Sequence, residues 1–150
     1  MPLAGVVNLW STESGSKQGT LDPHGKFAMS VAYSPDGRLI ATGDGALWFH
    51  PSTSVCPTPM GQPRTEFCVG VPAAAEGAVT VFDVNSGTPV CKLEGHNMAV
   101  RALAFGPDSG SLLTGSDDKC IHLHDIKAGN LVASLGGHGS WVLGLARSPR

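Results

Sequence analysis

The sequence predicts an all-β fold built from repeated four-stranded antiparallel units, and two observations lead to that prediction. The first is composition, because the 150 residues include 20 Gly and 11 Pro and only 15% are charged. Such a composition favours many short strands joined by tight turns over packed helices. The second is an internal repeat with a period of 42 residues. A period of this size is typical of a unit with four strands.

Three landmarks define the repeat by recurring at the same distance of 42 residues. They are Gly95-His96 with Gly137-His138, Phe82-Asp83 with His124-Asp125, and Gly87 with Gly129. A Gly-His pair near the start and a Trp-Asp-like pair near the end of such a period are the signature of a β-propeller blade. We therefore expect successive blades stacked side by side.

An upstream copy of the repeat is about 30 residues longer than the others. The extra residues lie at about 45–74, where five of the 11 prolines occur. Because proline removes a hydrogen-bond donor from a strand ladder, we expect an irregular loop there. Two explanations are open: the segment is a functional insertion, or it comes from a retained intron or a gene-model error and is not part of the ancestral domain. The landmarks of the longer copy match the next one at a distance of 72 residues: Pro35 with Pro107, Thr42-Gly43 with Thr114-Gly115, and Trp10-Ser11 with Phe82-Asp83.

Strands are expected wherever apolar and polar residues alternate between turn signals. Ser14-Gly15 and Pro35-Asp36-Gly37 are such turns, since proline presets φ and glycine accepts a positive φ. The most complete blade covers residues 100–135, and the first strand of a further blade begins at Trp141. In chain order, the expected strands are residues 6–10, 17–21, 27–34, 38–42, 78–84, 89–93, 100–105, 111–115, 120–126, 131–135 and 141–146.

These strands make two complete blades and parts of two others. The first two strands are the third and fourth of one blade, and the last strand is the first of another. Because propellers close with about four to eight blades, we expect a partial propeller with unpaired strand edges at its ends. The chain is predicted to be one domain, residues 1–150, interrupted by the insert at about 45–74.

The Gly-His and Trp-Asp-like landmarks, with the Ser-Pro-Asp-Gly turn at 34–37, resemble those of WD40-repeat proteins. The resemblance covers the chain apart from the insert. It implies a fragment of a seven-bladed ring, in which each blade holds a buried chain of hydrogen bonds. In the complete blade it assigns His96, Thr114 and Asp118 to that chain, with His124 in the tryptophan position.

The same assignment in the preceding blade gives Thr42, Glu76 and Phe82, with His24 loosely in the histidine position. His138 begins the chain of the following blade. Phe82 has no hydrogen-bond donor, so the chain is weaker there. Since buried polar groups need partners, we interpret these residues as structural rather than catalytic.

Two other motifs are considered as functional sites, one for a metal ion and one for a phosphate group. His122 and His124 lie two residues apart on a strand, so they share a face and are candidates for a metal-binding pair. We expect no metal site, because no third ligand is evident. The run 136–140 is rich in glycine but lacks the Lys-Ser/Thr of a phosphate-binding loop. We therefore expect no enzyme activity, no cofactor and no small-molecule substrate.

Charge and hydropathy exclude further classes. The formal net charge of −2 gives no basic surface for direct nucleic-acid binding. No apolar run approaches the ~18 residues of a membrane span, and no signal peptide is recognisable. The four cysteines include no Cys-x-x-Cys pair and no zinc spacing, which favours reduced thiols inside the cell.

Binding is expected on the propeller face formed by the loops that precede the first strands and by the loops between the second and third strands. Met98, Arg101 and Trp141 lie near the starts of first strands, and such side chains often anchor protein interfaces. They are the candidate protein-binding residues. For Trp141, packing between two blades is the alternative.

Three longer runs resemble WD40 subunits of the superkiller complex, which are shared with the RNA polymerase II-associated factor complex. They cover residues 25–43, 79–109 and 129–143. The resemblance implies a scaffold in exosome-mediated mRNA decay and in transcription elongation, located in cytoplasm and nucleus. Its implied partners are a tetratricopeptide-repeat protein and an RNA helicase. Another WD40 adaptor, such as a ubiquitin-ligase substrate receptor or signalling scaffold, and a truncated non-functional product are the alternatives.

Overall fold

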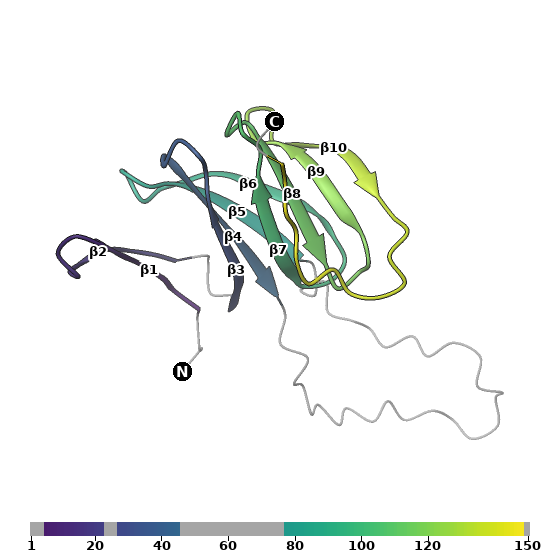
Figure 1. Ribbon diagram of the computed structural model, residues 1–150, viewed down its shortest axis with the longest axis horizontal. Helices are drawn as coiled ribbons and strands as arrows, with labels where there is room; N and C mark the ends of the chain where they lie inside the picture. Colours follow the sequence, from purple (N-terminus) through teal and green to yellow (C-terminus); the bar gives the residue numbers. More distant parts are fainter. Residues whose placement is uncertain (1–4, 23–26, 46–76, 149–150) are drawn as a thin grey trace, which may run out of the picture.

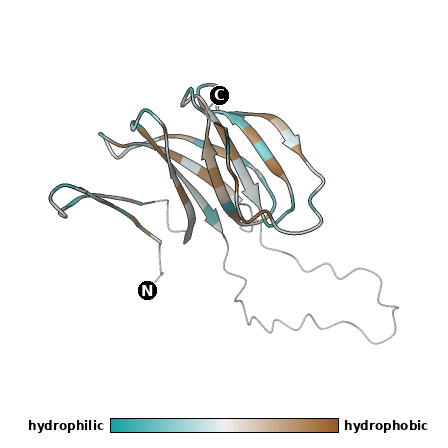
Figure 2. Ribbon diagram, viewed as in Figure 1, coloured by the Kyte–Doolittle hydropathy of each residue, from teal (hydrophilic) through white to brown (hydrophobic). Residues whose placement is uncertain are grey.

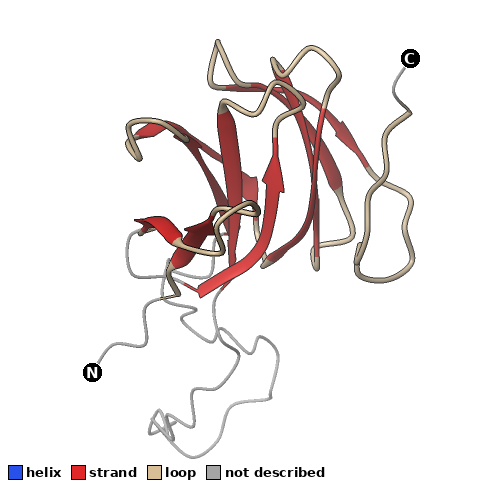
Figure 3. Ribbon diagram, turned by 60° about the vertical axis from the view of Figure 1, so that its left-hand side comes forward, coloured by secondary structure: helices blue, strands red, loops and turns tan. Residues whose placement is uncertain are grey.

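The computed structural model describes residues 5–22, 27–45 and 77–148, and every regular element in these ranges is a β-strand (Figures 1 and 3). The prediction of an all-β fold is confirmed. Within these ranges there is no helix that could cross a membrane. The strands are β1 (Val7–Trp10), β2 (Lys17–Leu21), β3 (Phe27–Tyr33), β4 (Leu39–Gly45), β5 (Gly77–Asp83), β6 (Pro89–His96), β7 (Val100–Phe105), β8 (Ser111–Ser116), β9 (Ile121–Asp125) and β10 (Asn130–Leu135).

The strands form two four-stranded antiparallel sheets and one hairpin. The first sheet has the order β3-β4-β5-β6, the second has the order β7-β8-β9-β10, and β1 pairs with β2. Within each sheet and within the hairpin, strands that follow one another along the chain pair with each other. The two sheets lie side by side, with β3, β4 and β5 of the first sheet all contacting β7 of the second (Figure 1). This is the stacking of successive blades that the 42-residue repeat predicts.

Equivalent residues occupy equivalent places in the two sheets. Ile40 pairs with Phe82 across β4 and β5, and Leu112 pairs with His124 across β8 and β9. The turns after β5 and β9 are also alike. The carboxylate of Asp83 accepts hydrogen bonds from two backbone N–H groups of its turn, and that of Asp125 does the same. Phe82 and His124 therefore occupy the same structural position, one sheet apart.

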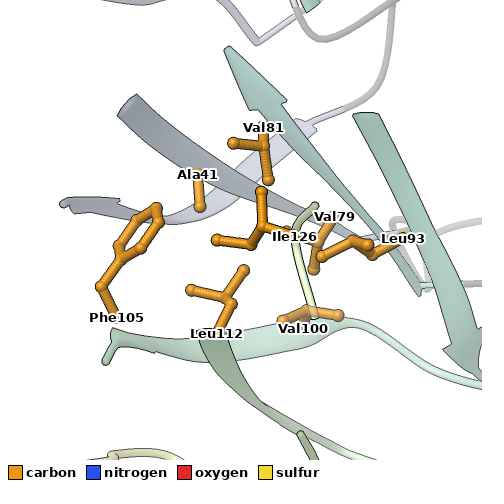
Figure 4. Packing of buried hydrophobic residues seen from close by; sticks show 8 residues of the cluster. All are labelled: Ala41, Val79, Val81, Leu93, Val100, Phe105, Leu112 and Ile126. Carbon is orange, nitrogen blue, oxygen red and sulfur yellow. The ribbon is translucent and has the colours of Figure 1, made fainter. Parts of the chain in front are cut away.

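A shared apolar core holds the two sheets together. Four residues from each sheet make it: Ala41, Val79, Val81 and Leu93 from the first, and Val100, Phe105, Leu112 and Ile126 from the second or the turn after it (Figure 4). Figure 2 shows apolar residues recurring along both sheets. A second cluster joins the hairpin to the first sheet through Leu21, Ile40 and Phe82. Burial of these side chains is the main source of stability for the stack.

Two strands continue well beyond their predicted ends. β4 continues to Gly45, the predicted start of the insert, because Phe27 of β3 pairs with Gly45. β6 continues to His96 because Gly77 pairs with that residue. Residues 46–74, which carry the rest of the predicted insert, lie outside the described residues.

The predicted strand at 141–146 was wrong. A strand needs a ladder to a neighbouring strand, and none of the described strands forms a ladder with this segment. It lies against β8 instead, where the N–H of Val142 donates to the carbonyl of Ser116 at 3.1 Å. The side chain of Val142 packs over Gly115, just as Val100 packs over Gly43. The segment thus repeats the stacking contact between the two sheets without a strand ladder.

Candidate functional site

The loop ends of the second sheet hold a buried polar chain centred on His96. The imidazole Nδ1 of His96 lies 2.8 Å from a carboxylate oxygen of Asp118, and its Nε2 lies 2.7 Å from the hydroxyl of Thr114. Both His96 and Thr114 are buried. The structure thus brings together three of the residues that the sequence assigned to the chain, from β6, β8 and the turn after β8.

Asp118 also fixes the backbone around this chain. Its carboxylate accepts hydrogen bonds from the N–H groups of Asn97 and Cys120. Burial alone would raise the pKa of Asp118, but the hydrogen bond with His96 and the two from the backbone outweigh it and lower that pKa. Asp118 therefore stays ionised and holds the loop after β6 against the turn after β8.

The predicted role of His124 needs correction. His124 is buried on β9, but its ring makes no hydrogen bond to Thr114; the Thr114 hydroxyl instead faces the backbone carbonyl of His122 at 3.5 Å. An imidazole is shorter than an indole, so it does not extend as far along the sheet as a tryptophan would. His138, also assigned to a hydrogen-bond chain, is exposed in the segment after β10.

Beside the chain lies His122, for which sequence reasoning had no structural role. Its ring stacks on that of His96, with centroids 3.9 Å apart and planes 8° apart. Gly95 makes room for this contact, because a Cβ there would lie 3.3 Å from Nδ1 of His122. That Nδ1 is buried and has no hydrogen-bond partner among the described residues. Two stacked rings do not converge on one ion, and no described group of three or more His, Cys, Asp or Glu could hold a metal.

The first sheet has a simpler arrangement at the same place. The hydroxyl of Thr42 donates to the carbonyl of Thr80 at 3.3 Å, and the carboxylate of Asp44 accepts from the N–H of Ala78 at 2.6 Å. Sequence reasoning missed Asp44, although its place two residues after Thr42 matches that of Ser116 after Thr114. Glu76 and His24, which the sequence had assigned here, lie outside the described residues.

The three candidate binding residues lie near the loop ends of β7 and β8. The guanidinium of Arg101 forms a forked pair with Asp117, with Nε 3.0 Å and Nη2 2.9 Å from carboxylate oxygens, and this hydrogen bonding raises the pKa of Arg101. The same guanidinium lies 5.8 Å from the ring centroid of Trp141, within cation–π range. Trp141 is 55% exposed, so it does not pack between two sheets in this structure. The carbonyl of Met98 accepts a hydrogen bond from Ser116.

A groove at the opposite ends of the sheets shows no catalytic arrangement. Asp36, Asp108 and Lys127 are among the residues that line it. Each carboxylate is held by its own turn, since Asp36 accepts hydrogen bonds from Ser34 and Arg38, and Asp108 accepts one from Ser111. These hydrogen bonds lower the pKa of both carboxyls, which does not suit a general acid.

Comparison with known proteins agrees with this architecture. The family model "WD domain, G-beta repeat" matches residues 15–50 and 87–125, together half of the chain. The WD repeat-containing protein SL1-17 of Schistosoma mansoni is 30% identical over 85% of this chain and 32% of its own length. Human WD repeat and SOCS box-containing protein 1 is 37% identical over 49% of this chain and 18% of its own length.

Among solved structures, the WD40 repeats of RRP9 superpose with a TM-score of 0.68 at 21% identity, covering 93% of this chain and 34% of that one. This likeness concerns the fold. The chain spans 32% of the length of SL1-17 and 34% of the length of the RRP9 chain. The matched repeats and the two stacked four-stranded sheets lead to one conclusion: the chain belongs to the WD40 repeat family.

Proposed function

We propose that the chain is a non-catalytic protein-interaction scaffold that binds its partner through the surface around Trp141. WD40 domains generally bind other proteins. The observation that carries the proposal is the half-exposed indole of Trp141 beside the Arg101–Asp117 pair. Exposed tryptophan and arginine are the side chains that most often anchor interfaces.

The arrangement suits an anchor because little side-chain freedom is left to lose. Asp117 holds Arg101 from one side, and the guanidinium lies near one face of the indole. Ordering such side chains on binding costs less than ordering free ones. The paired charges also favour a partner surface with apolar or aromatic groups over a strongly acidic one, because Arg101 is already neutralised by Asp117.

For the assembly, we propose the superkiller complex in exosome-mediated mRNA decay and the RNA polymerase II-associated factor complex in transcription elongation. Partners there would be a tetratricopeptide-repeat protein and an RNA helicase, and the chain would act in cytoplasm and nucleus within a seven-bladed ring. The resemblance of residues 25–43, 79–109 and 129–143 supports this proposal. A second candidate is an adaptor of another assembly, favoured by the likeness to the SOCS box-containing relative.

Binding of the full chain to each purified superkiller subunit tests the proposal by calorimetry. We expect saturable binding to one of them and a loss of at least about tenfold in affinity for Trp141→Ala. Trp10→Ala is the matched control, because Trp10 is 61% exposed but lies on β1, at the other end of the stack. Absence of binding to either subunit would overturn the assignment to this complex. An equal loss for both variants would overturn the role of Trp141.

A further inference from the structure

Three buried histidines lie together where the end of β6, in the first sheet, meets β9 of the second sheet, and the polar chain above uses only one of them. His96, His122 and His124 are each at most 6% exposed. The rings of His122 and His124 meet edge to face at 5.9 Å, while His122 stacks flat on His96. The first sheet has Phe82 where the second has His124, so the imidazole at this position belongs to the second sheet and not to the repeat.

The surroundings of His122 and His124 favour neutral rings. Protonation of His122 would place a hydrogen on Nδ1, which is buried without an acceptor. Two protonated rings stacked at the distance of His96 and His122 would repel each other. His124 lies on β9 opposite Leu112, in surroundings that solvate a charge poorly.

Few charged groups face the cluster from the elements packed against it. Asp118, from the turn after β8, touches His96 and is the carboxylate that favours a charge on His122. β8 and β10 place the uncharged residues Thr114 and Ser134 opposite His122. On β6, Lys92 and Glu94 form an ion pair with each other, and both side chains are more than half exposed.

We propose that His122 and His124, packed against the His96 ring, form a pH-sensitive switch that opens the second sheet in mild acid while the first sheet stays closed. The opening would release the loop after β6, because Asp118 and His96 hold that loop through the same hydrogen bonds. The proposal concerns the stability of the sheet and does not depend on which partner the chain binds.

Folding lowers the pKa values of His122 and His124, so acid should destabilise the folded chain, as the switch requires. Burial, followed by repulsion from neighbouring imidazoles, lowers the pKa of His122 and lowers that of His124 to about 4. An unfolded histidine has a pKa of about 6.5. The unfolded chain therefore binds more protons than the folded chain between these values. Stability is fully present above about pH 6.5 and is lost as the pH falls towards 4.

Urea unfolding of the full chain at pH 7.5 and pH 5.0 tests the proposal. From His124 alone we expect the unfolding equilibrium constant to rise about 30-fold at the lower pH. His124→Phe, which copies Phe82 of the first sheet, should remove about this factor. The matched control is His138→Gln, because His138 is exposed and lies outside the cluster. The carboxyls with lowered pKa values stay ionised at both pH values, so they do not contribute to this change in stability. They are Asp36, Asp83, Asp108 and Asp118.

Two results would overturn the switch. One is a pH dependence in His124→Phe equal to that of the unchanged chain; the other is an equal reduction in His138→Gln. If His124→Phe does not fold, nuclear magnetic resonance of the unchanged chain decides instead. The switch requires the His124 imidazole to stay neutral at pH 5.5, where an accessible histidine is mostly protonated. A midpoint at 6.5 or above for this ring would contradict the proposal.

Discussion

The two sheets have the same strand order and equivalent register, yet they fill one buried position with opposite chemistry. In the first sheet Phe82 packs with Leu21 and Ile40 in an apolar cluster. In the second sheet His124 lies in the same position, next to His122 and His96. The fold is thus set by strand pairing and turns, which are common to both sheets. The residue in the buried position determines how each sheet responds to mutation and to acid.

The largest effect is expected from Phe82→Ala, which tests the apolar packing at this position of the first sheet. Phe82 is 2% exposed and joins the hairpin to the first sheet. Removal of its ring should lower the free energy of unfolding by about 3–5 kcal/mol, through lost burial and the cavity left behind. Urea unfolding at pH 7.5 measures this. Tyr33→Ala, at a 55% exposed aromatic, should cost less than about 1 kcal/mol. Similar costs for the two variants would contradict the packing described for Phe82.

A smaller effect is expected from two single threonine substitutions, one in each sheet, which test the buried hydrogen bonds. Thr114→Val leaves Nε2 of His96 without its partner, so we expect a loss of about 1–3 kcal/mol. Thr42→Val removes only a hydroxyl that donates to the carbonyl of Thr80, with a loss of about 0.5–1.5 kcal/mol. Both variants are compared by thermal unfolding under identical conditions. A larger loss for Thr42→Val would show that the hydrogen-bond chain adds nothing to the second sheet.

The smallest difference between the two sheets is expected where they are alike. Gly87 and Gly129 both have φ of +66 in the turn before the last strand of their sheets. Alanine at either position should cost about 1–2 kcal/mol, because a Cβ disfavours that backbone conformation, and the two costs should agree. Gly136→Ala is the control, since Gly136 is not among the glycines of positive φ and a Cβ there would meet open space. Unequal costs in the two turns would count against the equivalence of the sheets.

Much of the fold could be predicted because its signals are local. The 42-residue spacing and the turn glycines are sufficient to place ten of the strands near their observed positions. The conformation of the segment after Trp141 could not be predicted from local signals. Its apolar pattern is that of a strand, but a strand ladder also requires a neighbouring strand to pair with. The ends of β4 and β6 were missed because Gly45 and His96 pair with residues distant in sequence.

The candidate site was only partly predictable for the same reason. The contacts of His96 with Thr114 and Asp118 follow from the repeat pattern. The stacking of His122 on His96 depends on how the end of one sheet meets a strand of the next, and Gly95 permits it only through that packing. The role expected for His124 rested on its place in the pattern, whereas its hydrogen bonds depend on side-chain length.

Hydrogen exchange of the full chain, followed by mass spectrometry at pH 7.5 and pH 5.0, tests the difference between the two sheets most directly. After correction for the intrinsic effect of pH on exchange, peptides from β8 and β9 should lose protection at pH 5.0, whereas those from β4 and β5 should keep it. Equal loss in both sheets, or protection kept in both, would contradict the account, because the buried histidines would then have no effect of their own on stability.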